Sequence, residues 1–380
     1  MIVQHFLKWL DTAKVQERAN AAGALARAYL DAGFSFEDRC AAEAALTLLL
    51  DDPSPKVRMA LSEVFSLSQL APAQIVAALA NDQPEVAAMV LVRSPLLQDC
   101  DLIDRAASGS GPIQRLIAMR AGVSVSLSAA LAEVGEPEAV IELLGNSSAS
   151  IATISFNRMA ERHGSRNDVR EALIAHKNLP AETRHRLMVK VSETLKSSPL
   201  VVALMGGARA ERMAREACQS GAVTLAETTP PQDHGALAEH LRLSGELTTA
   251  FVLRIVAHGK ADFLAAILAA LSRLAPARVA DLLANGRDGA VAAMLAKAGL
   301  AEITAAPILK ALKIWREVAT GKRVCGIQEV TWRMLAEIPG IERPQGPPES
   351  HQEIAALLRA LHLEALRGNA RGHALAITAA

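Results

Sequence analysis

One turn pattern recurs along the first half of the sequence and constrains the fold more than any other feature. An apolar helix ends in a short polar turn, and a second apolar helix begins at or near a proline, as at Pro55 before Val57. Proline suits the first turn of a helix because the N–H that it lacks would have no helical partner there. Copies of the pattern occur at residues 48–58, 79–86, 108–113 and 143–151, with a weaker copy at 176–182. Their spacing is typical of two-helix repeats.

The composition indicates that these repeats stack into an all-helical fold. Apolar residues make up 51% of the chain but aromatic residues only 3%, so alanine, leucine, valine and isoleucine must fill the core. No sustained period-two alternation of the kind that marks strands is present. A two-helix repeat cannot bury its apolar face alone and must stack on its neighbours. We therefore predict an all-α helical-repeat solenoid, a right-handed α-α superhelix.

The second half of the sequence carries a weaker version of the same pattern. Residues 80–89 are echoed at 284–294, with an asparagine turn before a Val-Ala-Ala-Met helix in both. We interpret the echo as a divergent repeat and predict a divergent C-terminal helical block. The expected organisation is N-terminal capping helices over 1–35, repeats over 36–196, the divergent block over 197–338, a Pro/Gly linker over 339–349, and an amphipathic helix with a mobile tail over 350–380.

The predicted C-terminal helix has a broad apolar face, formed by Ile354, Leu357, Leu358, Leu361 and Leu366. Such a helix can dock on its own chain or on another protein. We favour docking on its own chain, because the terminal repeats of a solenoid need a cover.

The charge balance and the cysteines indicate which partners and which cellular compartment are favoured. Lys+Arg and Asp+Glu are both 40, so the net charge lacks the basic excess typical of proteins that grip a phosphate backbone. The four cysteines lie far apart, which favours a reducing compartment over a disulfide framework. No apolar run is long enough to span a membrane. We expect a cytoplasmic protein and leave its oligomeric state open.

The residues that could form catalytic or ligand-binding motifs do not have the spacing that these motifs require. Gly321 and Lys322 lack the upstream glycine and the following hydroxyl of a phosphate-binding loop. His234 and His240 are six positions apart, whereas zinc-binding histidines on one helix face use i, i+4 spacing. No serine lies in a G-x-S-x-G turn. We therefore expect no catalytic, cofactor-binding or metal-binding residues.

Two basic clusters are the candidate partner-binding surface: Arg158, Arg162 and Arg166, and Lys310, Lys313 and Arg316. A solvated helix face is the simpler interpretation of both clusters. An acidic protein surface is the next alternative, and a phosphate backbone is the third. We expect a different role for Arg58, which follows an anchor valine: bracing adjacent turns through their acids or carbonyls.

A family resemblance supports this fold. Residues 51–58, with an acid, a proline and Val-Arg in order, look like the HEAT-repeat pattern. The sequence also resembles a family of uncharacterised alphaproteobacterial proteins with a HEAT-like domain of unknown function, over most of residues 40–335. The match rests on residues 80–82, 93–95, 101–103, 255–259 and 297–300. The resemblance implies a helical-repeat fold in a bacterial cytoplasm and brings no catalytic residues.

The sequence thus favours a non-enzymatic protein-binding scaffold or regulatory adaptor that uses the solenoid surface. This expected function is inferred by analogy, from the fold alone. The alternative is a nucleic-acid-binding or DNA-repair protein of the HEAT-like glycosylase type. It is disfavoured by the neutral net charge and by the wide separation of the three tryptophans along the sequence.

Overall fold

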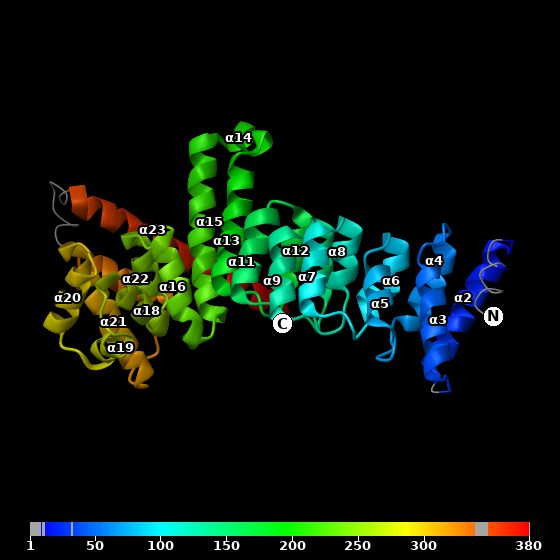
Figure 1. Cartoon of the computed structure of the whole chain (residues 1–380). Helices are drawn as coiled ribbons and strands as arrows, with labels where there is room; N and C mark the ends of the chain where they lie inside the picture. The colour runs from blue at the N-terminus through cyan, green and yellow to red at the C-terminus, as the bar shows by residue number, and fades with distance from the viewer. Residues whose placement is uncertain (1–8, 10–11, 32, 339–348, 380) are drawn as a thin grey trace. The chain divides into compact units, whose positions relative to one another are not determined.

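The computed structural model describes residue 9 and residues 12–31, 33–338 and 349–379. Every regular element over these residues is a helix (Figure 1). The prediction of an all-α fold is confirmed. The chain divides into two compact units, unit 1 (Met1–Thr183) and unit 2 (Arg184–Ala380), which are described separately. None of the described helices is long and apolar enough to cross a membrane.

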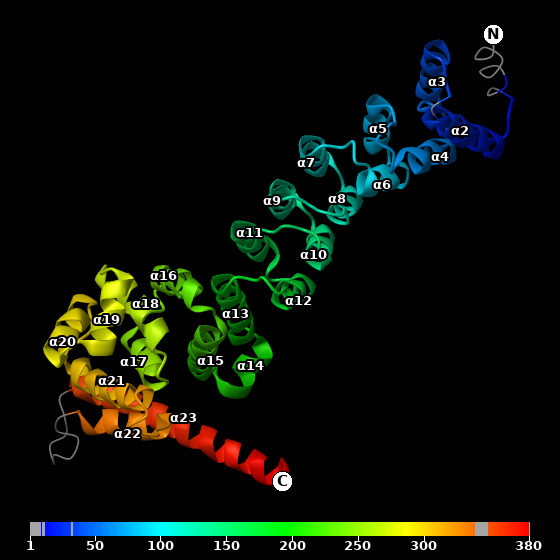
Figure 2. The same ribbon diagram turned by 90° about the horizontal axis from the view of Figure 1, so that it is seen from below.

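Unit 1 consists of helix pairs that stack in two rows. Each even-numbered helix from α2 to α10 contacts the next even-numbered helix, and α9 contacts both α7 and α11. Figure 2 shows the two rows. These contacts agree with the stacking of helix pairs that the repeated turns predict, while the solenoid and the handedness of its superhelix stay predictions. The helices are α2 (Val15–Leu30), α3 (Phe36–Leu49), α4 (Pro55–Phe65), α5 (Ala73–Ala80), α6 (Pro84–Arg93), α7 (Asp99–Ser108), α8 (Gly111–Ala118), α9 (Val125–Val134), α10 (Pro137–Gly145), α11 (Thr153–His163) and α12 (Asn167–Ala175).

Prolines open the second helix of several pairs, as expected. Pro55, Pro84 and Pro137 are the first residues of α4, α6 and α10. The anchor residues Val57 and Val86 are fully buried between the rows. Burying such side chains contributes about 1.5–3 kcal/mol each, which is why single helix pairs do not stand alone.

Two of the predicted turn copies were assigned to the wrong kind of turn. Residues 143–151 and 176–182 connect one helix pair to the next, whereas the turn within the α9–α10 pair lies at residues 135–136, before Pro137. Both kinds of turn follow an apolar helix and carry polar residues. The local pattern therefore does not distinguish a turn within a pair from a turn between pairs.

Arginine side chains brace the turns of unit 1, as predicted for Arg58. Its guanidinium donates to both carboxylate oxygens of Asp82, at 2.5 and 3.0 Å, and to the carbonyl oxygen of Asp52, at 2.5 Å. Arg105 donates to the carbonyls of Ala80 and Asp82 at 2.9 and 3.0 Å. The bond to Ala80 satisfies a carbonyl that the end of α5 leaves without a backbone donor, and the other bonds tie the adjoining turns to α4 and α7.

Unit 2 packs around one buried helix. Every residue from Phe251 to Ala257 of α17 is buried, because α18, α21, α22 and α23 contact this helix from several sides. The helices are α13 (Ala181–Lys196, which begins at the unit boundary), α14 (Pro199–Met205), α15 (Gly207–Thr228), α16 (His234–Leu243), α17 (Thr249–Ala257), α18 (Ala261–Ser272), α19 (Pro276–Asn285), α20 (Asp288–Lys297), α21 (Ala305–Ala319), α22 (Ile327–Ala336) and α23 (Glu349–Ala379).

Short polar residues and a glycine set the ends of α16 and α17. Ser244 ends α16, and its hydroxyl donates to the carbonyl of His240. The Thr248 hydroxyl caps the start of α17 by accepting a hydrogen bond from the N–H of Phe251. Gly259 follows the end of α17, with φ +69°. A Cβ there would lie 2.9 Å from the Trp315 ring, so only glycine fits without strain.

The C-terminal helix α23 docks on its own chain, as favoured. Ala355, Leu358 and Leu361 are buried, and α23 contacts α22 and α17. Glu364 forms a 2.7 Å ion pair with Arg254, a residue of α17 that is only 7% exposed. The linker predicted over 339–349 lies almost wholly outside the described residues. The backbone of α23 stays helical to Ala379, over the stretch expected as a mobile tail, whose mobility stays a prediction.

Candidate functional site

The second helices of three consecutive pairs in unit 1, α6, α8 and α10, form an open groove of about 570 Å³. Helix α8 has two apolar faces: Ile113 and Ile117 are buried in the core, while Leu116 and Met119 line the groove. A surface helix normally has one apolar face and one polar face. We call this surface the α6–α8–α10 groove; it is lined by Pro84, Glu85 and Ala88 of α6, by Gly111, Pro112, Arg115, Leu116 and Met119 of α8, and by Glu136 and Glu138 of α10.

The floor of the groove is apolar and accessible. Met119 is 45% exposed at the end of α8, and Pro112 is exposed at its start. Scattered exposed apolar residues are ordinary, but apolar residues that gather in one depression mark an interaction surface. Methionine adapts its shape to different partners because its side chain is unbranched and polarizable.

The rim of the groove is acidic. Glu85, Glu136 and Glu138 are exposed, although Glu138 also pairs with Arg166 at 3.2 Å. The one arginine in the lining, Arg115, is paired with Glu142 at 3.0 Å. Gly111 allows this arrangement, because a Cβ at that position would collide with the Glu136 carboxylate. The groove therefore combines an apolar floor with a negative rim, which suits an apolar segment flanked by lysine or arginine.

The first predicted basic cluster, Arg158, Arg162 and Arg166, lies on and just after α11. Arg158 binds the Glu133 carboxylate at 2.6 and 2.8 Å, and Arg162 donates to the carbonyls of Ala132 and Gly135 at the end of α9.

Arg166 pairs with Asp168 at 2.6 Å and with Glu138 at 3.2 Å, and its hydrogen bond is the main cause that lowers the pKa of Asp168 to about 2. The positive charges of the first cluster that the sequence singles out are thus largely matched by acids or used to cap a helix.

The second predicted cluster, Lys310, Lys313 and Arg316, lies on α21 and is similarly engaged. Arg316 donates to three carbonyls at the end of α19, those of Leu282, Leu283 and Gly286, at 2.7 to 3.2 Å. Lys310 pairs with Glu337 at 2.8 Å. Lys313 is exposed and has no hydrogen-bond or ion-pair partner among the residues that the structure describes.

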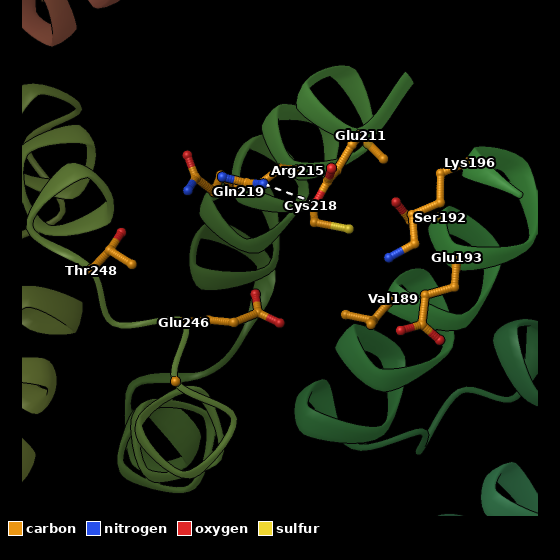
Figure 3. A pocket seen from close by; sticks show the side chains of 12 residues that line it. Val189, Ser192, Glu193, Lys196, Glu211, Arg215, Cys218, Gln219, Glu246 and Thr248 are labelled. Atoms are coloured by element: carbon orange, nitrogen blue, oxygen red, sulfur yellow. Dashed lines mark hydrogen bonds and ion pairs between the residues drawn. The ribbon is translucent and has the colours of Figure 1, made fainter. Parts of the chain in front are cut away.

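A second hollow, of about 280 Å³, lies in unit 2 between α13 and α15 (Figure 3). Ser192 and Glu193 reach it from α13, and Glu211 and Cys218 reach it from α15. A nucleophilic cysteine requires a base that is hydrogen-bonded to its thiol, and within the described residues the thiol of Cys218 has no such partner. We see in this hollow no arrangement that points to a reaction.

Two histidines that are far apart in the sequence meet near Glu246, one of the residues that line this hollow. The fully buried His185 lies with Nδ1 3.3 Å from His240 Nε2 and with Nε2 3.2 Å from the Glu246 carboxylate. Burial, together with the charges of His185 and Arg186, lowers the pKa of His240 to about 4. Sequence reasoning missed this pair, because spacing along the chain carries no signal of a contact between α13 and α16. In the part of the chain that the structure describes, no group of three or more histidine, cysteine, aspartate or glutamate side chains is placed to hold a metal ion.

Comparison with protein families supports the resemblance to an uncharacterised bacterial family. A bacterial family described as "Uncharacterised protein conserved in bacteria" (DUF2336) matches residues 86–337. The chain belongs to this family. The DUF2336 match includes nearly all of the groove and continues through α22 of unit 2. No curated protein and no solved structure matches the chain.

Proposed function

We propose that this DUF2336 protein is a non-enzymatic, cytoplasmic protein-binding scaffold or adaptor built on a HEAT-like solenoid of the alphaproteobacterial type. The α6–α8–α10 groove carries the proposal, since it is apolar, open and formed by equivalent helices of consecutive repeats. Repeat proteins commonly bind partners along such continuous surfaces. The groove takes a helix of the partner, with apolar side chains on the floor and basic side chains against the rim.

The dimensions and charge of the groove support a helical partner segment. An amphipathic helix binds a groove through anchors at i, i+3 or i+4 and i+7, and the floor supplies a matching apolar strip along α8. A few buried anchors carry most of the affinity in such interfaces. Met119 is the residue we expect a partner anchor to cover, because it is the most exposed large apolar side chain that lines the groove.

The contacts of the basic clusters argue against the nucleic-acid alternative. Phosphate binding needs arginine and lysine side chains that can release counterions. Of the six predicted candidates, Arg158, Arg166 and Lys310 are paired with acids, and Arg162 and Arg316 bond to carbonyls. A gel-shift affinity for DNA or RNA that weakened steeply with added salt would favour the alternative again.

The test is affinity capture from native cytosol with a matched pair of variants. Met119→Lys places a cation on the groove floor, at a helix C-terminus where a positive charge is tolerated, and repels a basic partner. Leu243→Lys makes the same change at the end of α16, where the leucine is 71% exposed. We expect a defined set of proteins to be retained by the wild type and Leu243→Lys and lost from Met119→Lys. Identical capture by all three chains would refute the groove as the binding site.

A further inference from the structure

The short helix α14 is an uncharged apolar apex at the ends of two longer helices. None of its residues is buried, and Leu200 and Leu204 are 68% and 76% exposed. Figure 1 shows α14 at the far end of α13 and α15, beyond the ends of the other helices of unit 2. Gly206, with φ +78°, provides the sharp reversal into α15. This surface plays no part in the proposed groove function.

Leucines this exposed are costly in water unless something covers them. Removing a leucine side chain from water contributes about 1.5–3 kcal/mol, so two such side chains on one short helix mark a contact surface. The helices next to α14 leave it uncovered. Two further exposed apolar residues, Leu195 of α13 and Met213 of α15, extend the surface along both supporting helices.

The charges around α14 are arranged in a band behind the apolar apex. Residues 197–208 contain no ionisable side chain. Lys196 on one side and Arg209 and Arg212 on the other are exposed, and the described residues supply no ion-pair partner for them. The nearest acid on α15, Glu211, is paired with Arg215 at 3.2 Å. An apolar apex is thus followed by three exposed cations without an ion-pair partner among the described residues, and the acids nearest to them are Glu193 of α13 and Glu211 of α15.

We propose that the α14 apex (Pro199–Met205) inserts shallowly into the surface of a bilayer that contains anionic phospholipids. An apolar segment flanked by lysine and arginine is the combination that binds such surfaces, the apolar side chains entering the interface and the cations meeting the lipid phosphates. The convex shape favours a lipid surface over a protein, because a protein partner would need a cavity to receive the apex. The inference is independent of the groove.

Vesicle flotation with the full-length chain tests the proposal. The wild type is expected to float with vesicles of phosphatidylcholine and phosphatidylglycerol and much less with phosphatidylcholine alone, and added salt is expected to release it. Leu200→Gln/Leu204→Gln is expected to weaken binding at least roughly tenfold, because two apolar anchors are lost. Arg209→Gln/Arg212→Gln is expected to weaken it about tenfold on anionic vesicles only.

Controls separate this surface from the rest of the molecule. Leu243→Gln removes an equally exposed leucine elsewhere in unit 2 and is expected to float as the wild type does. Circular dichroism checks that each variant is folded.

The proposal is overturned if the leucine variant floats unchanged, or if neutral and anionic vesicles bind equally. It is also overturned if no vesicle binds and the leucine variant instead abolishes self-association in sedimentation velocity, which would make the apex a contact between two copies.

Discussion

Replacing Arg58 with alanine should loosen the stack of unit 1 at one identifiable turn. Arg58 joins α4 to two turns, because it extends to the carboxylate of Asp82 before α6 and to the carbonyl of Asp52 before α4. The side chains of Arg58 and Asp82 are only 15% and 18% exposed. The variant leaves both acceptors without this donor in a partly dehydrated position.

The size of the effect follows from that exposure. Hydrogen bonds to charged groups contribute about 1.5–3 kcal/mol when buried, whereas exposed ion pairs contribute about 0–1 kcal/mol. A pair this shielded lies between the two, so we expect Arg58→Ala to cost about 2 kcal/mol. In a unit of this size that corresponds to a fall in Tm of roughly 4–8 °C. Arg115→Ala removes a pair whose arginine is 59% exposed and should cost less than about 1 kcal/mol.

The pH dependence of the stability provides a second test of the pair of Arg58 and Asp82. Burial opposes ionisation of Asp82, but hydrogen bonds from Arg58 and from the Gln83 N–H outweigh burial and lower the pKa of Asp82. The unfolded chain therefore binds this proton at a higher pH than the folded chain does. The resulting stability is present above the ordinary carboxyl pKa of about 3.9 and is lost as the pH falls through the lower folded pKa.

The assay is urea and thermal unfolding of both arginine variants followed by circular dichroism, with hydrogen exchange to locate the change in α4 and α6. The stability difference between the wild type and Arg58→Ala should shrink as the pH falls below about 4. Equal losses for Arg58→Ala and Arg115→Ala would refute the bracing role, as would a difference that stays constant into acid.

Three further outcomes are expected in unit 2. Gly259→Ala should cost more than Gly299→Ala in thermal unfolding, since both glycines have positive φ but only Gly259 would also place a Cβ against a tryptophan ring; equal losses would contradict this packing. Glu364→Ala should speed hydrogen exchange across α23, because it leaves the nearly buried Arg254 without its carboxylate; unchanged protection would show that apolar packing alone holds the helix. His240→Gln should make the loss of stability of unit 2 between about pH 6.5 and 4 smaller than in the wild type. The pKa of His240 is about 4 in the folded chain and lies below its unfolded value, so the unfolded chain takes up the proton first. An unaltered dependence of stability on pH would exclude this residue as a cause.

The helical fold was predictable because its signals are local. A proline at the start of α4 or α6 and a buried valine two residues later report directly on a helix start and on its core face. The bracing by Arg58 followed from the same turn. The assignment of residues 143–151 failed because two kinds of turn share one local chemistry, and only the stacking of α8 on α10 distinguishes them.

The candidate site was less predictable, because it depends on neighbours in space. Arg162 and Arg316 read in the sequence as available cations, but each sits where the end of another helix presents carbonyls. The groove has no sequence signature of its own, since Met119 becomes part of it only when α6 and α10 flank α8. The contact between His185 and His240 likewise needs α13 and α16 to meet.

Photo-crosslinking from Met119 is the sharpest test of whether the α6–α8–α10 groove binds a protein. A photoreactive amino acid replaces Met119 in the full-length chain, and a second chain carries it at Leu243 as the control. We expect a discrete protein adduct from position 119 alone, with the crosslinked peptide on an amphipathic helix that carries lysine or arginine beside its apolar face. Equal yields from both positions, or adducts with nucleic acid only, would contradict it.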